Sequence, residues 1–340
     1  MPPLVPNGFV GQKSLLRQMV LAGNAQTSWG TPVAAAALVE ALRYDIAGFV
    51  KFSQTKESTY GTAGATNSFA SDSWITGRKT SVDISGQLTD WLAGWLMAFP
   101  LGKEVVVGAG APYTHTFNFL DTGNIAQGTT IYAQDTNDLA YQLVDMGVSQ
   151  VTITSSGTGT LKFKATLMGT GRFVDGILPN MPYPVQRQHL LGGDTTVSIG
   201  PSGGALASFY PRVKSWELTI DAGLAEERPA GSGLYASHLI TTMPKVKLKM
   251  VIAANSVDDI NAWKRANTLL QATLNTTSNG SSLNLTLPSF TLNNDCELGD
   301  VNGETCWNID LTEQDILQIG NTPLLTVVVV NSQASYLAVA

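Results

Sequence analysis

The sequence contains few of the residues from which metal sites and disulfide frameworks are built. Its 340 residues include two cysteines and three histidines. Cys296 and Cys306 are separated by an Asn-Gly turn, so they could face each other on a hairpin. Nothing in the sequence indicates an oxidising compartment, and we therefore predict two reduced thiols. There is no HExxH or CxxC motif and no cluster of Cys and His, so we expect no metal site and no cofactor.

Motifs that carry catalytic chemistry are also scarce. The chain has no GxxxxGK[ST] phosphate-binding loop. His115, His189 and His238 share no motif, and His115 falls within an alternating strand pattern, which favours a structural role. The carboxylate pairs Asp258-Asp259 and Glu226-Glu227 are explained by a helix start and by a solvated loop. We expect that the protein is not an enzyme.

Charge is scarce as well. Charged residues make up 14% of the chain, hydrophobic residues make up 44%, and the formal net charge is −6. A free monomer normally carries more surface charge, so this composition indicates a subunit whose surface is mostly interface. Because nucleic-acid-binding surfaces are basic, the net negative charge argues against one. The apolar runs at 34–39 and 326–330 are too short to cross a membrane, and the N-terminal residues lack a secretory-signal pattern.

Alternating strand patterns occur twice in the same order: strand, long polar loop, strand and short helix. These strands and the helix lie at 49–54, 79–88 and 89–99 in the first copy and at 216–221, 245–252 and 256–267 in the second. Alternation with a period of two predicts strands with one buried and one solvated face. Thr89 and Ser256 are the expected helix N-caps, because a hydroxyl there accepts a bond from the first turn.

Further strand patterns also recur in the same order in the two halves of the chain. They match 113–119 with 282–288, 141–154 with 296–311, and 161–169 with 324–332. The recurrence in one order predicts a duplication, with a first domain at 49–170 and a second at 213–340. Residues 1–48 form an N-terminal arm, in which 14–21 is helix-like and 32–44 is either a helix or an extended segment on a neighbouring subunit. Residues 171–212 are rich in Gly and Pro and form a linker with one strand near 195–199.

Several segments resemble the major tail tube proteins of long, flexible-tailed bacteriophages. They are GNAQTSWGTPV at 23–33, YGT at 60–62, SVDISGQLTDWLAGWL at 81–96, YTHTFNF at 113–119, QGTTIYAQ at 127–134 and VDMGVSQVTITSSGTGTLKFKATLMG at 144–169. The resemblance covers most of the chain. It implies a mainly β fold with two tandem β-sandwich tail-tube domains, each with a short flanking α-helix and a long loop between two strands.

The resemblance also implies a structural virion protein. Copies of such proteins form rings that stack into a hollow tail tube through which DNA is ejected. Two similar domains in one chain would let three chains form a ring of six similar positions, and closure would cover the exposed sheet edges. The implied partners are other copies of the chain, the tape measure, terminator and baseplate proteins, and viral DNA in transient, non-specific passage. The implied location is the virion tail, assembled in the host bacterial cytoplasm.

Two groups of residues receive expected roles on this basis. The loops at 55–78 and 222–244 should contact the next ring and be mobile before assembly. Their candidate contact residues are Lys56, Tyr60, Trp74, Glu226, Glu227, Arg228 and Tyr235. A wall that passes DNA without holding it should be neutral or acidic, since each neutralised phosphate adds affinity. The expected lumen-facing residues are Ser81, Asp83, Ser85, Gln87, Glu217 and Asp221, with Lys245, Lys247 and Lys249 expected to pair with carboxylates on adjacent strands.

Other functions stay open at this point. A related ring component, such as a tail terminator, a baseplate hub or a secretion-system tube, would share most of these features. A secreted β-sandwich that binds carbohydrate would need exposed aromatic platforms, for which Tyr235 is the one candidate. A hydrolase on a β-scaffold has no motif to support it. Tubes or rings of the purified protein in electron microscopy would separate these classes.

Overall fold

The computed structural model describes residues 18–34, 38–42, 48–60, 70–120, 125–136, 139–176, 187–255, 259–293 and 296–337. The fold is mainly β, with 57% of residues in strands and 8% in helices. Its sheets are antiparallel, which suits strands that bury one face and leave the other solvated. The predicted mainly β fold is confirmed.

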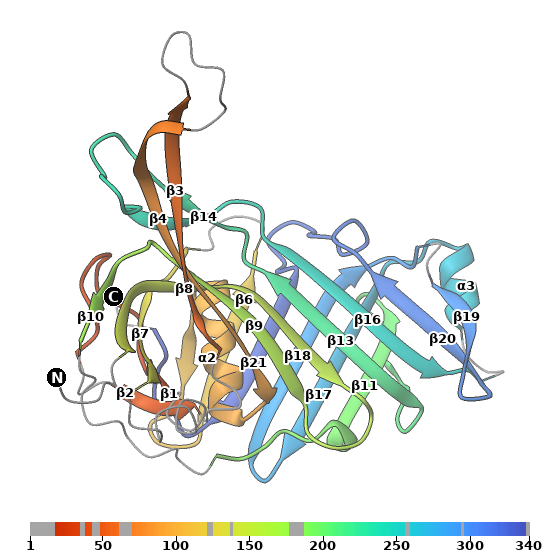
Figure 1. The fold of residues 1–340 in the computed structure, drawn as a ribbon. Coiled ribbons are helices and arrows are strands. Elements are labelled where there is room, and N and C mark those ends of the chain that lie inside the picture. The colour runs from red at the N-terminus through yellow and green to blue at the C-terminus, as the bar shows by residue number, and fades with distance from the viewer. Residues whose placement is uncertain are drawn as a thin grey trace.

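Eight strands of the larger sheet, sheet 1, follow one another in a continuous path (Figure 1). In order across the sheet they are β3 (Val50–Tyr60), β4 (Ala70–Gln87), β9 (Lys162–Gly169), β8 (Leu139–Ser155), β13 (Val213–Asp221), β16 (Lys245–Ala253), β20 (Glu304–Leu311) and β19 (Glu297–Val301). The N-terminal half of β8 also carries a wing, formed by β7 (Thr129–Thr136), β1 (Gln18–Ala22) and β2 (Leu38–Leu42). The short strand β10 (Phe173–Asp175) pairs with the other side of β8.

The path consists of two four-stranded units joined edge to edge. The unit β3-β4-β9-β8 comes from the first half of the chain, and β13-β16-β20-β19 comes from the second. Both units have the same strand order: across the sheet, the first strand in chain order is followed by the second, then the fourth, then the third. This common order agrees with the repeated sequence pattern. At the junction, Gln150–Ser155 of β8 pair with Trp216–Asp221 of β13. The predicted match of 161–169 with 324–332 is wrong, because β9 lies in sheet 1 whereas 325–331 form a strand of the other sheet.

The second sheet, sheet 2, also runs through both halves of the chain. Its strands in order are β12 (Ala207–Ser208), β11 (Thr195–Pro201), β17 (Leu270–Ser278), β18 (Ser281–Phe290), β21 (Leu325–Asn331), β6 (Tyr113–Phe119) and β5 (Val105–Val107). Pairing of β21 with β6 joins the halves within this sheet. Buried residues from both sheets and both halves form one continuous hydrophobic core. The two repeats therefore share an interior.

Helix α2 (Asp90–Leu101) is enclosed by the sandwich, and all of its residues are buried. It begins as predicted at Thr89, whose Oγ1 accepts a hydrogen bond from the Leu92 N–H at 3.3 Å. The sequence predicts a helix that flanks the sandwich. A helix that is hydrophobic on all sides is stable only when surrounded, and Ala93, Gly94 and Met97 complete an apolar circumference here.

Helix α3 (Ile260–Arg265) lies at the opposite end of the molecule, next to β19 (Figure 1). It is short and largely exposed, and Ile260 is its one buried residue. Asp259 occupies the N-cap position without a side-chain cap bond. The expected N-cap Ser256 lies outside the described residues. The two helices follow equivalent strands, β4 and β16, but their surroundings differ completely.

The segments predicted as long polar loops are partly paired strands. Thr55–Tyr60 of β3 pair with Ala70–Gly77 of β4, so most of 55–78 is a two-stranded ribbon that projects from the sandwich (Figure 1). The 222–244 segment contains a second hairpin, β14 (Leu224–Glu227) with β15 (His238–Thr241). The loop prediction was wrong over these strands because a ribbon solvated on both faces has no apolar stripe to reveal it.

The N-terminal and linking segments also differ from expectation. Strand β1 overlaps the helix-like pattern at 14–21, and Val20 of β1 packs on Tyr132 of β7. Strand β2 lies within 32–44, so part of that segment is extended, but it pairs with β1 of the same chain. Pairing in a sheet has overridden a weak local propensity. The strand expected near 195–199 is confirmed as β11, which follows a short 3₁₀-helix, η2 (Gly192–Asp194). Residues Leu190, Val197 and Phe209 tie the 187–212 segment into the core.

Candidate functional site

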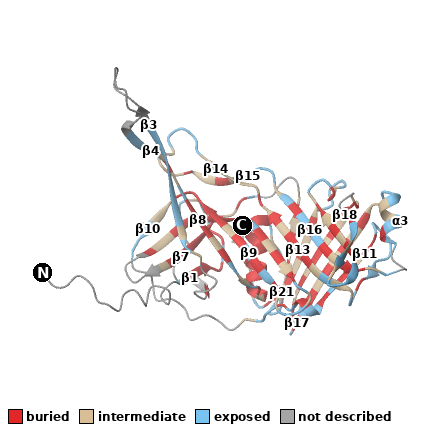
Figure 2. Cartoon of the chain, turned by 45° about the vertical axis from the view of Figure 1, so that its right-hand side comes forward, coloured by how far each residue is buried: buried red, intermediate tan, exposed pale blue. Residues whose placement is uncertain are grey.

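Sheet 1 has one exposed polar face, which we call the polar face. In β13 and β16, buried apolar residues alternate with partly exposed polar ones (Figure 2). The cross-strand register brings the polar residues of successive strands into rows. One row consists of Gln87, Lys162, Thr154, Glu217, Lys249 and Asp310. All of the predicted lumen-facing residues are gathered on this face, namely Ser81, Asp83, Ser85, Gln87, Glu217 and Asp221.

The three lysines of β16 pair with carboxylates, as predicted. Lys249 Nζ lies 2.8 Å from Asp310 Oδ2 on the adjacent strand β20. Lys245 and Lys247 each lie 3.2 Å from Glu313, in the turn that follows β20. These exposed ion pairs add little stability, about 0–1 kcal/mol each. Their main effect is electrostatic, because they place a negative charge beside each positive one.

Lowered pKa values favour the ionised form of two carboxylates of the polar face, Asp83 and Glu313. Hydrogen bonds from Lys51 and then from Thr166 lower the pKa of Asp83. The backbone N–H of Glu313 and then the ammonium of Lys245 lower the pKa of Glu313 to about 2. The lysines of the polar face are Lys51, Lys79, Lys162, Lys164, Lys245, Lys247 and Lys249. The carboxylates are Asp83, Glu217, Asp221, Glu297, Asp310 and Glu313, together with Glu226, which lies 3.9 Å from Lys79. These charges sum to 7 − 7 = 0, and a further pair at the margin, Lys214 with Glu304 at 2.6 Å, adds no net charge.

Sheet 2 has a different chemistry. None of its seven strands contains Lys, Arg, Asp or Glu. Its partly exposed positions carry Thr, Ser, Asn and Val, for example Thr116, Asn284 and Val328. The charge of the strands is therefore concentrated on sheet 1 and its hairpins.

The two sheets also end differently. Within the described residues, the eight-stranded path of sheet 1 ends at β3 and β19, each of which pairs with one neighbour only, as do the shorter strands β2 and β10 beside the path. The β3 and β19 edges carry exposed apolar side chains on the core side, with Phe52 40% and Leu298 52% exposed. Sheet 2 ends at β5 and β12, which have three and two residues. Very short edge strands block further pairing, whereas long ones invite it. Sheet 1 is the sheet that can continue into another chain.

The β3–β4 ribbon projects beyond both sheets (Figure 2), and its strand β3 is exposed from Lys51 to Glu57. The predicted contact residues Lys56 and Trp74 lie on it, with Trp74 45% exposed. Tyr60 is the last residue of β3, and its side chain lies outside the description. An exposed Trp on a solvated ribbon is typical of a residue that becomes buried in an interface.

The other predicted contact residues lie in or beside the β14–β15 hairpin. Glu226, Arg228 and Tyr235 contact residues of the same chain at the base of the ribbon, above all Arg78. Glu227 is a partly exposed residue of β14. The sequence did not single out Arg78, and no local pattern marks it, because its partners are about 150 residues away along the chain.

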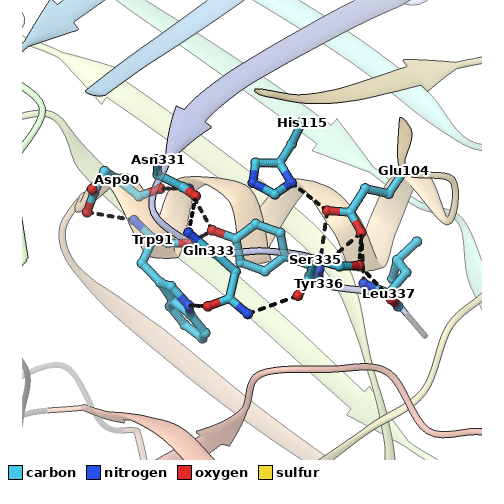
Figure 3. Close-up of polar contacts among 9 residues, drawn as sticks. All are labelled: Asp90, Trp91, Glu104, His115, Asn331, Gln333, Ser335, Tyr336 and Leu337. Atoms are coloured by element: carbon cyan, nitrogen blue, oxygen red, sulfur yellow. Dashed lines mark hydrogen bonds and ion pairs between the residues drawn. The ribbon is translucent and has the colours of Figure 1, made fainter. Parts of the chain in front are cut away.

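His115 belongs to a buried network that holds the C-terminal residues 331–337 (Figure 3). Its Nδ1 lies 2.7 Å from Glu104 Oε1, and both side chains are almost fully buried. Glu104 also accepts bonds from Ser335 Oγ at 2.7 Å and from the N–H groups of Tyr336 and Leu337 at 3.0 Å. Burial raises the pKa of Glu104, but the hydrogen bonds from His115, Leu337 and Ser335 together lower it by more than burial raises it. The net pKa is below the usual value, so the carboxylate is ionised. His115 Nδ1 therefore donates, and its role is structural.

Other candidate chemical sites have similarly plain explanations. Cys296 and Cys306 are free and buried, and burial raises the pKa of Cys296 to about 11, so its thiol is unreactive. The expectation that the chain carries no hydrolase motif is wrong in one respect, because residues 200–204 spell GxSxG. Ser202, however, lies in a turn after β11 and donates to the Pro288 carbonyl at 3.2 Å. That turn leads to no helix and so forms no nucleophile elbow. The described residues contain no group of three His, Cys, Asp or Glu placed to hold a metal ion.

The fold and its surfaces define a structural subunit, a two-sheet β protein with open edges on its charged sheet and a projecting ribbon. Over residues 17–325 the chain matches the model of the phage tail tube protein family, and it belongs to that family. It is therefore a component of the virion tail that assembles into a tube with other tail proteins. No curated protein matches the chain. No helix in the described part of the chain has the length and hydrophobicity needed to cross a membrane.

Proposed function

We propose that three copies of this chain close into a ring, and that stacked rings form the tube of a long, flexible tail through which DNA is ejected. The observation that carries the proposal is the junction between β8 and β13. It joins the last strand of the first four-stranded unit to the first strand of the second. The same kind of junction between β19 of one copy and β3 of the next would repeat the pattern around a ring.

The strand directions support this junction. All neighbours along the eight-stranded path are antiparallel, so β3 and β19 run in opposite directions. An antiparallel β19–β3 pair between copies therefore continues the alternation without a break. It would also bury Leu298 and Phe52 and use the backbone groups of both edges. Closure in a ring satisfies the β3 and β19 edges of every copy, whereas open pairing always leaves one of each exposed.

The size of the resulting barrel favours three chains. Three chains provide 3 × 8 = 24 strands. With strands about 4.8 Å apart and tilted about 40°, such a barrel is about 48 Å wide between backbones, which leaves about 38 Å inside the side chains. Two chains would leave an internal diameter of about 22 Å, only slightly more than the roughly 20 Å width of a DNA duplex. Six chains would leave an internal diameter of about 85 Å.

The polar face would then line the lumen. Its charges cancel, and Lys51, Lys245, Lys247 and Lys249 lie beside carboxylates. A wall without net positive charge displaces few counterions from DNA, so it binds the polyanion weakly and lets it slide. The projecting β3–β4 ribbon would contact the next ring. The remaining proposed partners are the tape measure, terminator and baseplate proteins, and the proposed place of assembly is the cytoplasm of the host bacterium.

Electron microscopy of the purified protein tests this proposal. We expect tubes whose rings contain three chains with pseudo-sixfold symmetry, and six chains per ring would overturn it. Leu298→Lys should leave a folded monomer that forms no tubes, because a charge at the β19 edge opposes pairing. Ile319→Lys is the matched control, since Ile319 is 47% exposed in the turn before β21, away from both edges. Tubes from both variants would rule out the β19–β3 junction.

A further inference from the structure

The two equivalent inter-strand segments of the repeat have different conformations. In the first unit, the segment between β3 and β4 extends these strands into the projecting ribbon (Figure 1). In the second unit, the segment between β13 and β16 folds into the β14–β15 hairpin, which lies beside the base of that ribbon (Figure 1). The second segment thus contacts the first within one chain.

The contact is made mainly by hydrogen bonds around Arg78 of β4. The Arg78 N–H donates to the Leu234 carbonyl at 2.8 Å. Arg78 Nη1 donates to the Tyr235 hydroxyl at 3.1 Å, and its guanidinium lies 5.8 Å from the centre of the Tyr235 ring. These bonds hold both the backbone and the side chain of one residue at the point where the ribbon leaves the sheet.

Arg228, which follows β14, adds a further hydrogen bond to Arg78. Its Nη2 donates to the Arg78 carbonyl at 2.6 Å and to Glu226 at 2.7 Å, and its Nη1 donates to the Leu234 carbonyl at 3.1 Å. Next to Arg78, Gly77 leaves room for this guanidinium, since a Cβ there would lie 3.2 Å from Arg228 Nη1. One side chain therefore links both hairpins.

The β14–β15 hairpin is itself fixed to the body of the protein. Leu239 is buried in a small cluster with Met168 and Ala126. The Ala236 N–H donates to the Thr170 carbonyl at 3.1 Å, and the Ala222 N–H donates to the Ser149 carbonyl at 2.8 Å. The strands of the hairpin are thus attached to the body of the protein, and the residues between β14 and β15 can support the base of the β3–β4 ribbon.

A two-stranded ribbon in water is only marginally stable by itself. The β3–β4 ribbon also has an irregular register between Thr55 and Lys56, where Thr76 of β4 is left without a partner in the ladder, and such a bulge bends the strand. A support at this point limits the directions in which the ribbon can point. An interface element that is already ordered loses less conformational entropy on binding, so the association is stronger.

We infer that the β14–β15 hairpin is an internal brace that sets the direction of the β3–β4 ribbon. Arg228 and Tyr235 are positioning residues in this brace. Each chain then presents one projecting ribbon, although it contains two copies of the repeat. The inference extends the proposed function, because it implies that a ring of three chains contacts the next ring through three ribbons, one per chain.

Hydrogen exchange of the unassembled protein tests the brace without depending on tube formation. Arg228→Ala should raise the exchange rates of amides in 50–60 and 70–78 by about tenfold, the effect of losing one bond to a charged group. Tyr235→Phe should raise them less, and both variants should keep the wild-type circular dichroism spectrum. Arg265→Ala, at an exposed arginine of α3, is the matched control and should change nothing in this ribbon. Unchanged ribbon exchange in folded Arg228→Ala would overturn the inference.

Exchange in assembled tubes tests the number of projecting elements. Assembly should protect amides of 50–60 and 70–78, while amides of 229–235 keep the rates they show in the free chain. Equal new protection of both segments would show that both reach the next ring and would overturn the inference. If the wild-type chain forms no tubes, the proposed function fails, whereas the comparison of unassembled variants still decides whether the brace exists.

Discussion

Glu104→Ala should release the C-terminal residues from the body of the protein. The Glu104 carboxylate accepts bonds from His115, Ser335, Tyr336 and Leu337 (Figure 3). Removing it leaves these donors without their acceptor in a buried place. Two responses are possible: the donors stay buried and unsatisfied, or residues 332–337 detach and expose the Tyr336 ring.

The smaller of the two free-energy costs decides which response occurs. Four lost bonds to a charged acceptor at about 1.5–3 kcal/mol each would cost about 6–12 kcal/mol. Detachment exposes Tyr336, now 0% exposed, at about 2–3 kcal/mol. It also breaks the two bonds of the Tyr336 hydroxyl with Trp91 and Asn331, the bond from the Ala25 N–H to the Tyr336 carbonyl and the bond from the Trp91 indole to Gln333, at about 1 kcal/mol each. Detachment is still the cheaper response over most of this range, and the expected loss is about 6–7 kcal/mol. For a chain of 340 residues this lowers Tm by about 9 °C, since the unfolding entropy is about 0.7 kcal/mol per degree.

Calorimetry and hydrogen exchange together measure this response. We expect the lower Tm together with rapid exchange of the amides of Tyr336 and Leu337, while the sheets stay protected. Glu304→Gln is the control, because Glu304 is an exposed partner of Lys214 and its loss should leave Tm within about 1 °C. A Tm of Glu104→Ala within about 1 °C of wild type would refute the reasoning.

The pH dependence of the same site has a definite sign. The pKa of Glu104 is lower in the folded protein than in the unfolded chain. Its contribution to stability is therefore fully present above the unfolded pKa and is lost as the pH falls through the folded pKa. The difference in Tm between wild type and Glu104→Ala should be constant near neutral pH and shrink below about pH 4.3. A difference that grew on acidification would contradict this assignment.

Three further predictions follow from single contacts. Gly94→Ala should destabilise the protein by about 1–3 kcal/mol in denaturant titrations, because the new Cβ would lie 2.4 Å from the Tyr336 ring, and wild-type stability would contradict that packing. Thr89→Ala should cost about 1 kcal/mol through loss of the N-cap bond to Leu92, whereas Thr89→Ser should restore most of it. His115→Ala should lower Tm through a cavity and a lost donor to Glu104, while electron micrographs taken below that Tm show normal tubes. Loss of tubes in a folded His115→Ala protein would assign His115 a role beyond packing.

Local periodicity alone predicted several features correctly. Alternation identified the strands β4, β13 and β16 and placed Asp83, Glu217 and Asp221 on one polar face. Lys245, Lys247 and Lys249 were predicted to pair with carboxylates on adjacent strands, which the structure confirms for Lys249 with Asp310, whereas Lys245 and Lys247 pair with Glu313 in the turn after β20. A hydroxyl before an apolar helical run predicted the N-cap at Thr89. These features depend on neighbours within a few residues, so the sequence contains the necessary information.

Other features were decided only by tertiary structure. The place of α2 between the sheets depends on which surfaces surround it, although its apolar circumference was a readable signal. The choice of β20 rather than β21 as the equivalent of β9 depends on pairing between distant strands. The same holds for the opposite behaviour of the two inter-strand segments, because Arg78 and Arg228 are 150 residues apart. Periodicity determines which face of a strand is buried, but it does not determine the partner, because any strand edge of suitable length can provide the backbone hydrogen bonds.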